Sequence, residues 1–141
     1  MLQFENVYKS YDRQQVLEIG SLKLGRNIYW LQGINGSGKT TFLSMLAGLI
    51  PFKGNILLDG INLREKPVSY RRLVNFAEAE PLFPDFITGI ELIGFYKNIR
   101  KAATVQTDHL INLFKMHHYL SLPIGNYSSG MIKKLSLLLA F

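Results

Sequence analysis

The chain has 141 residues, of which 48% are hydrophobic and 18% are charged, a composition typical of a folded globular protein rather than a disordered one. It contains no cysteine, which excludes a disulfide framework and a cysteine-ligated metal site. The net charge of +6 is compatible with phosphate ligands, nucleic acid or an anionic membrane surface and does not distinguish between them.

The first 30 residues are expected to form strands. Residues 2–8 alternate between apolar and polar side chains, and two further short segments, 16–19 and 22–24, follow with Gly20 between them, a pattern typical of strands separated by turns. Residues 27–31 are largely apolar and predict a buried strand that leads into the next segment.

That next segment, residues 33–40, has the sequence GINGSGKT, which matches the phosphate-binding loop G-x-x-x-x-G-K-[ST]. Gly36 and Gly38 allow the backbone to curl so that successive N–H groups point at phosphate oxygens. Lys39 supplies a cation to the β- and γ-phosphates, and the Thr40 hydroxyl can bind Mg²⁺. The helix that begins here adds its positive dipole end. The sequence therefore predicts a nucleoside-triphosphate site.

Beyond the loop, apolar residues recur at helical spacing over residues 42–49 and predict a helix. Residues 51–54 break the chain because they contain Pro and Gly, residues 55–60 predict a strand that enters a turn, and residues 73–77 predict another strand.

The rest of the chain is expected to be helical. Thr104 and Ser129 are residue types that favour helix starts. The predicted helices cover residues 88–100, 104–120 and 129–141.

The last of these helices carries a second motif. The sequence NYSSGMIKKLSLLLAF, residues 126–141, resembles the L-S-G-G-Q signature of ATP-binding-cassette (ABC) ATPases. In that family the motif is a helix N-terminus that closes on the ATP bound by the other protomer; the alternative is an ordinary helix cap. The residues that align with the motif are Tyr127, Ser128, Ser129, Gly130 and Met131.

The resemblance extends along the whole chain, including GNILLDG at residues 54–60 and the segment 81–96. It implies an α/β phosphate-loop NTPase fold of the ABC ATPase type, with an antiparallel β subdomain and an α-helical subdomain. The expected domains are a nucleotide-binding core over 1–84 and a helical subdomain over 85–141. It also implies an aromatic residue that stacks on adenine. The residues expected to bind ATP are Tyr11, with Tyr8 as the rival for its role, and Asn35, Gly36, Ser37, Gly38, Lys39, Thr40 and Thr41.

The expected metal ligands are Thr40 and Glu78. The family places a glutamine that touches Mg²⁺ between its two subdomains, whereas this sequence has NFAEAEPLF. Glu78 is the preferred occupant of that position and Glu80 the alternative. The other interpretation of either glutamate is a solvated loop charge. Asp59 is not expected to bind the metal, because Gly60 follows it where a hydrolase would place a glutamate.

No residue of this sequence matches the strand aspartate, catalytic glutamate and switch histidine that follow the signature motif in the family. His109, His117 and His118 precede the motif and are expected to be surface or packing residues. The chain is therefore expected to be an N-terminal fragment of a longer ATPase domain that is inactive by itself.

The resemblance implies a cytoplasmic ATP-binding subunit, peripheral to the inner face of the cell membrane, that powers an ABC transporter. Its expected ligands are ATP and Mg²⁺. Its expected partners are a second protomer, head to tail in a homodimer, and a transmembrane permease; no nucleic acid is expected. The alternatives are a soluble ABC ATPase acting on nucleic acid or ribosomes, and a small phosphate-loop kinase. Four aromatic residues are expected either to pack in the core or to receive the permease: Phe83, Phe86, Phe95 and Tyr96.

Overall fold

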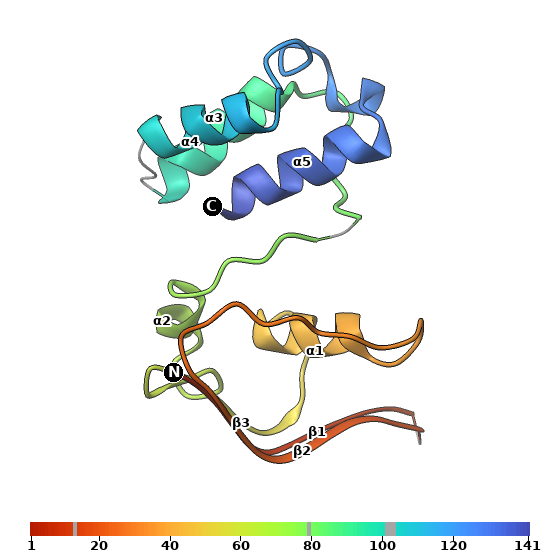
Figure 1. Ribbon diagram of the computed structural model, residues 1–141, viewed down its shortest axis with the longest axis vertical. Helices are drawn as coiled ribbons and strands as arrows, with labels where there is room; N and C mark the ends of the chain where they lie inside the picture. Colours follow the sequence, from red (N-terminus) through yellow and green to blue (C-terminus); the bar gives the residue numbers. More distant parts are fainter. Residues whose placement is uncertain (13, 79, 101–103) are drawn as a thin grey trace. The chain divides into compact units, whose positions relative to one another are not determined.

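The computed structural model describes residues 1–12, 14–78, 80–100 and 104–141. The chain forms two compact units, Met1–Asn75 and Phe76–Phe141 (Figure 1). We call them the sheet unit and the helical unit. The sequence-based division after residue 84 lies inside the helical unit.

The sheet unit is built on an antiparallel sheet with the strand order β2-β1-β3-β4. Residues 16–19 and 22–24, expected as separate strands, join through Gly20 into β2, because pairing with β1 continues along the whole segment. The turn expected after β3 is present, since Asp59 and Gly60 both have positive φ angles. The strands are β1 (Leu2–Tyr11), β2 (Gln14–Leu24), β3 (Lys53–Leu58) and β4 (Ile61–Asn62).

Two helices complete this unit: α1 (Lys39–Leu46) and the short α2 (Pro67–Arg71). Helix α1 packs its apolar side on the sheet, and Figure 1 shows it lying alongside the strands. The rings of Phe4 and Phe42 stack at 5.5 Å, which joins β1 to α1. The residues at the centre of this core are Phe4, Val7, Met45, Ile56, Leu63 and Tyr70.

The pairing of β1 with β3 depends on one glycine. Gly54 has φ +90°, and a Cβ there would overlap the carbonyl oxygen of Asn6 and lie 2.7 Å from that of Glu5. Only glycine adopts this conformation without strain and allows so close an approach. The pairing register shifts between Glu5 and Tyr8, at the same place.

The buried strand predicted for residues 27–31 is wrong. These residues form no strand, and Ile28 and Trp30 are 97% and 88% exposed. A buried strand of this kind needs neighbours that cover both its edges and its faces. In the described parts of the chain, the four strands pair only with one another. The strand predicted for residues 73–77 is also absent, although Val74 packs against the core.

The helical unit confirms the helices predicted at 88–100 and 129–141. The helix predicted for 104–120 is too long: α4 ends at Leu113, and Lys115, with φ +56°, ends the helical conformation. Met116 and Tyr119, beyond that break, are buried in the core of the unit. The helices are α3 (Gly89–Arg100), α4 (Thr104–Leu113), the 3₁₀ turn η1 (Ile124–Asn126) and α5 (Ser129–Ala140).

Among the described residues, no helix combines the length and the apolar character needed to cross a membrane.

Candidate nucleotide-binding site

The phosphate-loop sequence forms a curled loop that leads directly into α1. Gly36 and Gly38 have φ angles of +81° and +86°, the left-handed region that glycine adopts without steric cost. The Ser37 amide donates to the Ile34 carbonyl at 3.2 Å, and the Phe42 amide donates to the Gly38 carbonyl at 2.8 Å as α1 begins. The loop therefore presents backbone N–H groups and a helix N-terminus at one place.

The Lys39 side chain bends over this loop. Its ammonium group donates to the carbonyl oxygens of Gly33 and Ile34 at 2.7 and 2.8 Å. These two bonds hold the ammonium group against the backbone of the loop. A lysine placed in this way can exchange its carbonyl contacts for phosphate oxygens, which form stronger, charge-assisted hydrogen bonds.

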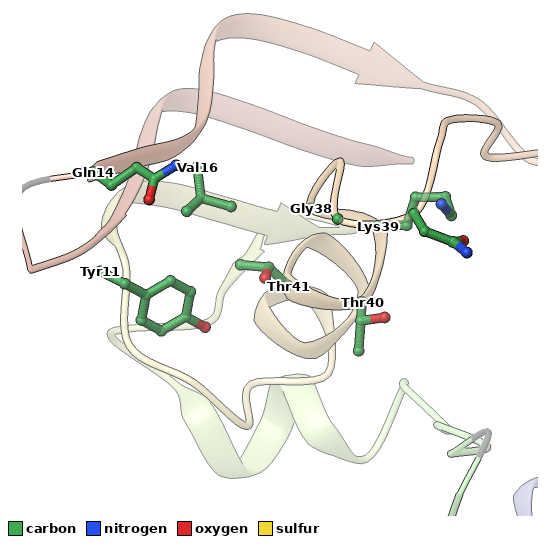
Figure 2. A pocket seen from close by; sticks show the side chains of 9 residues that line it. Tyr11, Gln14, Val16, Gly38, Lys39, Thr40 and Thr41 are labelled. Carbon is green, nitrogen blue, oxygen red and sulfur yellow. The ribbon is translucent and has the colours of Figure 1, made fainter.

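A cavity of about 470 Å³ lies beside the loop, within the usual size range of ligand pockets. Figure 2 shows Tyr11, Gln14 and Val16 on the strand side and Lys39, Thr40 and Thr41 at the start of α1. Of the residues expected to bind ATP, Ser37 belongs to the loop but does not line the cavity. The lining residues are Tyr11, Gln14, Val16, Asn35, Gly36, Gly38, Lys39, Thr40 and Thr41.

The structure distinguishes the two candidate tyrosines. Tyr8 and Tyr11 are three residues apart in β1, and an odd spacing places side chains on opposite faces of a strand. Tyr11 lines the cavity beside the phosphate loop. Tyr8 instead lines a separate cavity, where the Lys53 ammonium lies 6.0 Å from its ring centre. This placement favours Tyr11 for the role of stacking on a base.

Gln14 and Val16 line the cavity but were not among the residues expected from the sequence. The pairing of β1 with β2 shifts between Lys9 and Ser10, so Val16 becomes an extra residue on β2. Bulges of this kind redirect side chains and occur often beside functional sites. A Cβ added to Gly38 would lie 3.2 Å from Val16 Cγ1. The bulge therefore places the Val16 side chain directly against the phosphate loop. No local sequence pattern signals such a bulge.

The signature residues lie at the start of α5. The helix begins at Ser129, as expected, and Ser128 before it is the cap residue: its hydroxyl accepts a hydrogen bond from the Met131 amide at 3.3 Å. The Ser128 amide in turn donates to the Met131 sulfur at 3.4 Å. Ser128, Ser129 and Gly130 are exposed. The motif therefore presents a capped helix N-terminus to its surroundings.

Tyr127 anchors this motif in the helical core. Its hydroxyl donates to the Tyr119 carbonyl at 2.9 Å, and the two rings meet edge to face with centres 5.0 Å apart. Burial raises the pKa of Tyr127, so the hydroxyl stays protonated and able to donate. The backbone that leads into Ser128 is thereby fixed by a buried hydrogen bond.

Gly130 is exposed, and a Cβ built there meets only the Ser128 hydroxyl oxygen, at 3.9 Å. The fold of the helical unit therefore has room for a larger residue at this position. A glycine near the start of a helix is unfavourable by itself.

Glu78 belongs to the helical unit, whereas Thr40 belongs to the sheet unit. The Glu78 carbonyl accepts a hydrogen bond from the Ser136 hydroxyl at 2.9 Å, which ties its backbone to α5. Within the described residues, no three His, Asp or Glu side chains gather as a metal site would require. Asp59 pairs with the N-terminal amine instead.

The histidines make local contacts. His117 Nε2 lies 2.7 Å from Asn112 Oδ1, and the His118 ring packs edge to face on Tyr119 at 5.0 Å. These contacts agree with the expectation that both are surface or packing residues.

The structure combines a phosphate loop at the start of α1, an antiparallel sheet and a helical unit that ends in α5. Together they define a protein of the phosphate-loop NTPase fold class. The family described as ABC transporter matches residues 21–141. The chain belongs to the ABC transporter family and has the phosphate-loop fold of its ATPase domains.

Relatives of known sequence agree with this assignment. The chain is 32% identical over 143 residues to the uncharacterized ABC transporter ATP-binding protein YxlF of Bacillus subtilis (strain 168). This match covers 97% of this chain and 47% of YxlF. It is 29% identical over 144 residues to the ABC transporter ATP-binding protein YtrB of the same organism, covering 100% of this chain and 48% of YtrB. The chain thus spans about half the length of these relatives.

Solved structures agree as well. An ATP-binding subunit of an ABC transporter matches with a TM-score of 0.83 and 25% identity, over 99% of this chain and 60% of that one. A putative ABC transporter ATP-binding protein from Pyrococcus furiosus matches with a TM-score of 0.80 over 98% of this chain and 68% of that one. Its identity of 21% supports the fold alone.

Proposed function

We propose that this chain binds the triphosphate of ATP together with Mg²⁺, as part of an ATP-binding subunit that powers transport across a membrane. The observation that carries the proposal is the shared cavity of the phosphate loop and Tyr11. Backbone amides and Lys39 would hold the phosphates, and the Tyr11 ring would stack on the base. Thr40 would bind Mg²⁺ through its hydroxyl, with Glu78 as the further ligand and Glu80 as its alternative.

The second part of the proposal concerns the signature residues Ser128, Ser129, Gly130 and Met131. An exposed, capped helix N-terminus is suited to a phosphate group. In this proposal it binds the ATP held by a second protomer, head to tail, and a transmembrane permease couples the dimer to transport. Such a subunit would lie on the cytoplasmic side of the membrane.

Two features count against the other functions considered. A small phosphate-loop kinase has no need for a signature helix, whereas α5 is present and the family match includes it. A role on nucleic acid is not favoured, since relatives of this chain are named for transport. One of them is the putrescine transport ATP-binding protein PotG of Escherichia coli (strain K12). It is 38% identical over 86 residues, and the match covers 60% of this chain and 23% of PotG.

Hydrolysis also requires a group that orients the attacking water. We assign no residue of this chain to that task, so we propose nucleotide binding as its own activity.

The direct test is Lys39→Ala, with ATP and Mg²⁺ titrated into the chain by calorimetry. Loss of charge-assisted hydrogen bonds worth about 1.5–3 kcal/mol should weaken binding by about tenfold or more. Lys23→Ala removes the same charge from an exposed position on β2 and should leave the affinity unchanged. Equal affinities for the parent chain and Lys39→Ala would refute the phosphate-loop assignment.

A further inference from the structure

Lys9 is a buried lysine beside the proposed nucleotide site. Its exposure is only 8%, although lysine is rarely buried unless its charge has a partner. In the described part of the chain the only ion pair joins the N-terminal amine to Asp59, so no carboxylate pairs with Lys9. Burial of most of this side chain removes part of the water around the ammonium group, which is unfavourable. Its contacts must therefore compensate for the lost hydration.

The Lys9 ammonium has two partners. It donates a hydrogen bond to the Pro51 carbonyl at 2.8 Å, and it lies 4.5 Å from the centre of the Tyr11 ring. That distance is within the range of a cation–π interaction. Lys9 and Tyr11 are two residues apart in β1, which places both side chains on the same face of the strand.

These contacts connect the Tyr11 ring, which lines the nucleotide cavity, to Pro51, which lines the separate cavity beside Tyr8. Tyr11 comes from the end of β1, whereas Pro51 lies between α1, which begins at the phosphate loop, and β3. Lys9 therefore ties the aromatic ring to the segment that follows the loop helix. Tyr11 is 48% exposed, so with the ammonium over one of its faces it still offers surface to the cavity. The register shift between Lys9 and Ser10 occurs at this same point.

We propose that Lys9 is a positioning residue for the nucleotide base: its ammonium holds the Tyr11 ring in the orientation in which a purine stacks on it. The inference rests on the proposed nucleotide binding by the phosphate loop. It assigns separate roles to the two lysines. The loop and Lys39 bind the triphosphate, whereas Lys9 acts only through Tyr11 and so only on ligands that carry a base.

The test compares two ligands on the chain, ATP and inorganic tripolyphosphate, each titrated with Mg²⁺ by calorimetry. Lys9→Gln keeps a donor for the Pro51 carbonyl but removes the cation. It should weaken ATP binding by about threefold to tenfold, the scale of a partly desolvated cation–π contact, and leave tripolyphosphate binding unchanged. Lys9→Arg keeps both contacts and should keep the parent preference for ATP. Lys23→Gln, at an exposed position on β2, is the matched control for the charge change.

A double substitution tests whether Lys9 acts through the Tyr11 ring. If Lys9 acts through the ring, Lys9→Gln should cause no further loss of ATP affinity in a Tyr11→Ala background. Equal weakening of ATP and tripolyphosphate would overturn the proposal, because it would indicate a general charge effect or a damaged fold. An unchanged ATP affinity, or additive losses in the double variant, would overturn it as well.

The outcomes also separate this inference from the proposed function. If Lys9→Gln does not fold, Lys9→Arg tests the positioning role instead. A folded Lys9→Arg chain that loses the preference for ATP over tripolyphosphate refutes that role. A parent chain that binds neither ligand refutes nucleotide binding, and the role of Lys9 with it. If the parent chain binds both ligands and the Lys9 variants bind each of them with the parent affinity, only the role of Lys9 is refuted.

Discussion

Gly89, the first residue of α3, should be essential to the anchoring of the signature motif. A Cβ at this position would overlap the Tyr127 hydroxyl and lie 2.8 Å from Leu120 Cδ2. Tyr127 would have to move and would lose its hydrogen bond to the Tyr119 carbonyl, 2.9 Å long in the parent. Overpacking costs about 1–3 kcal/mol and the lost hydrogen bond about 1 kcal/mol. Gly89→Ala should therefore destabilise the helical unit by about 2–4 kcal/mol.

The assay is urea unfolding followed by circular dichroism at 222 nm, which reports mainly on helices. The matched control is Gly94→Ala in the same helix, where a Cβ meets no atom within 4 Å. That substitution should stabilise the unit by about 0.5–1 kcal/mol, because alanine loses less backbone entropy in a helix than glycine does. The main difference between the two alanines is what their methyl groups touch; Gly89 is also the first residue of the helix, whereas Gly94 lies inside it.

Tyr127→Phe completes the test, since it removes the hydroxyl that the new methyl group would meet. Alone it should cost about 1 kcal/mol for the lost hydrogen bond. Combined with Gly89→Ala it should cost clearly less than the sum of the two single changes, because part of the overlap is gone. Equal stabilities of the Gly89→Ala and Gly94→Ala chains, or strictly additive costs in the double variant, would refute the reasoning.

Three further outcomes are expected. Tyr11→Ala should weaken ATP binding by about fivefold or more through lost stacking, while Tyr11→Trp preserves it and Tyr8→Ala has no effect in the same titration; the opposite pattern would assign the base to Tyr8. Gly130→Ala should raise the stability of the helical unit by about 0.5 kcal/mol, since its methyl group meets only the Ser128 hydroxyl oxygen, at an ordinary contact distance of 3.9 Å; a loss in urea unfolding would show that the fold itself requires this glycine. Burial raises the pKa of Tyr70 to about 12, so the folded chain holds this proton more tightly than the unfolded chain, whose tyrosines titrate near 10. The contribution of Tyr70 to the free energy of unfolding should be fully present below about pH 10 and should fall by about 1.4 kcal/mol per pH unit towards pH 12. A Tyr70→Phe chain whose free energy of unfolding declines equally steeply would contradict this.

The sequence alone predicted the features that are set by short-range spacing. The glycines at 36 and 38 have the left-handed backbone that the phosphate-loop pattern requires, and the helices expected at 88–100 and 129–141 are present. The strand expected over residues 2–8 and the turn expected after β3 are present as well. Each of these depends on backbone preferences of residues that are neighbours in the chain, so a local pattern is sufficient to predict it.

Tertiary structure decided the features that depend on residues far apart in the chain. Residues 27–31 have the composition of a buried strand, yet Trp30 is exposed because no described strand pairs with them. The strand side of the candidate site depends on a bulge that places Val16 against the phosphate loop. The contacts of Lys9 with Pro51 and the Tyr11 ring likewise have no signature in sequence. Burial and pairing are properties of the neighbours that a segment acquires on folding, and those neighbours are fixed only when the whole sheet and its helix pack together.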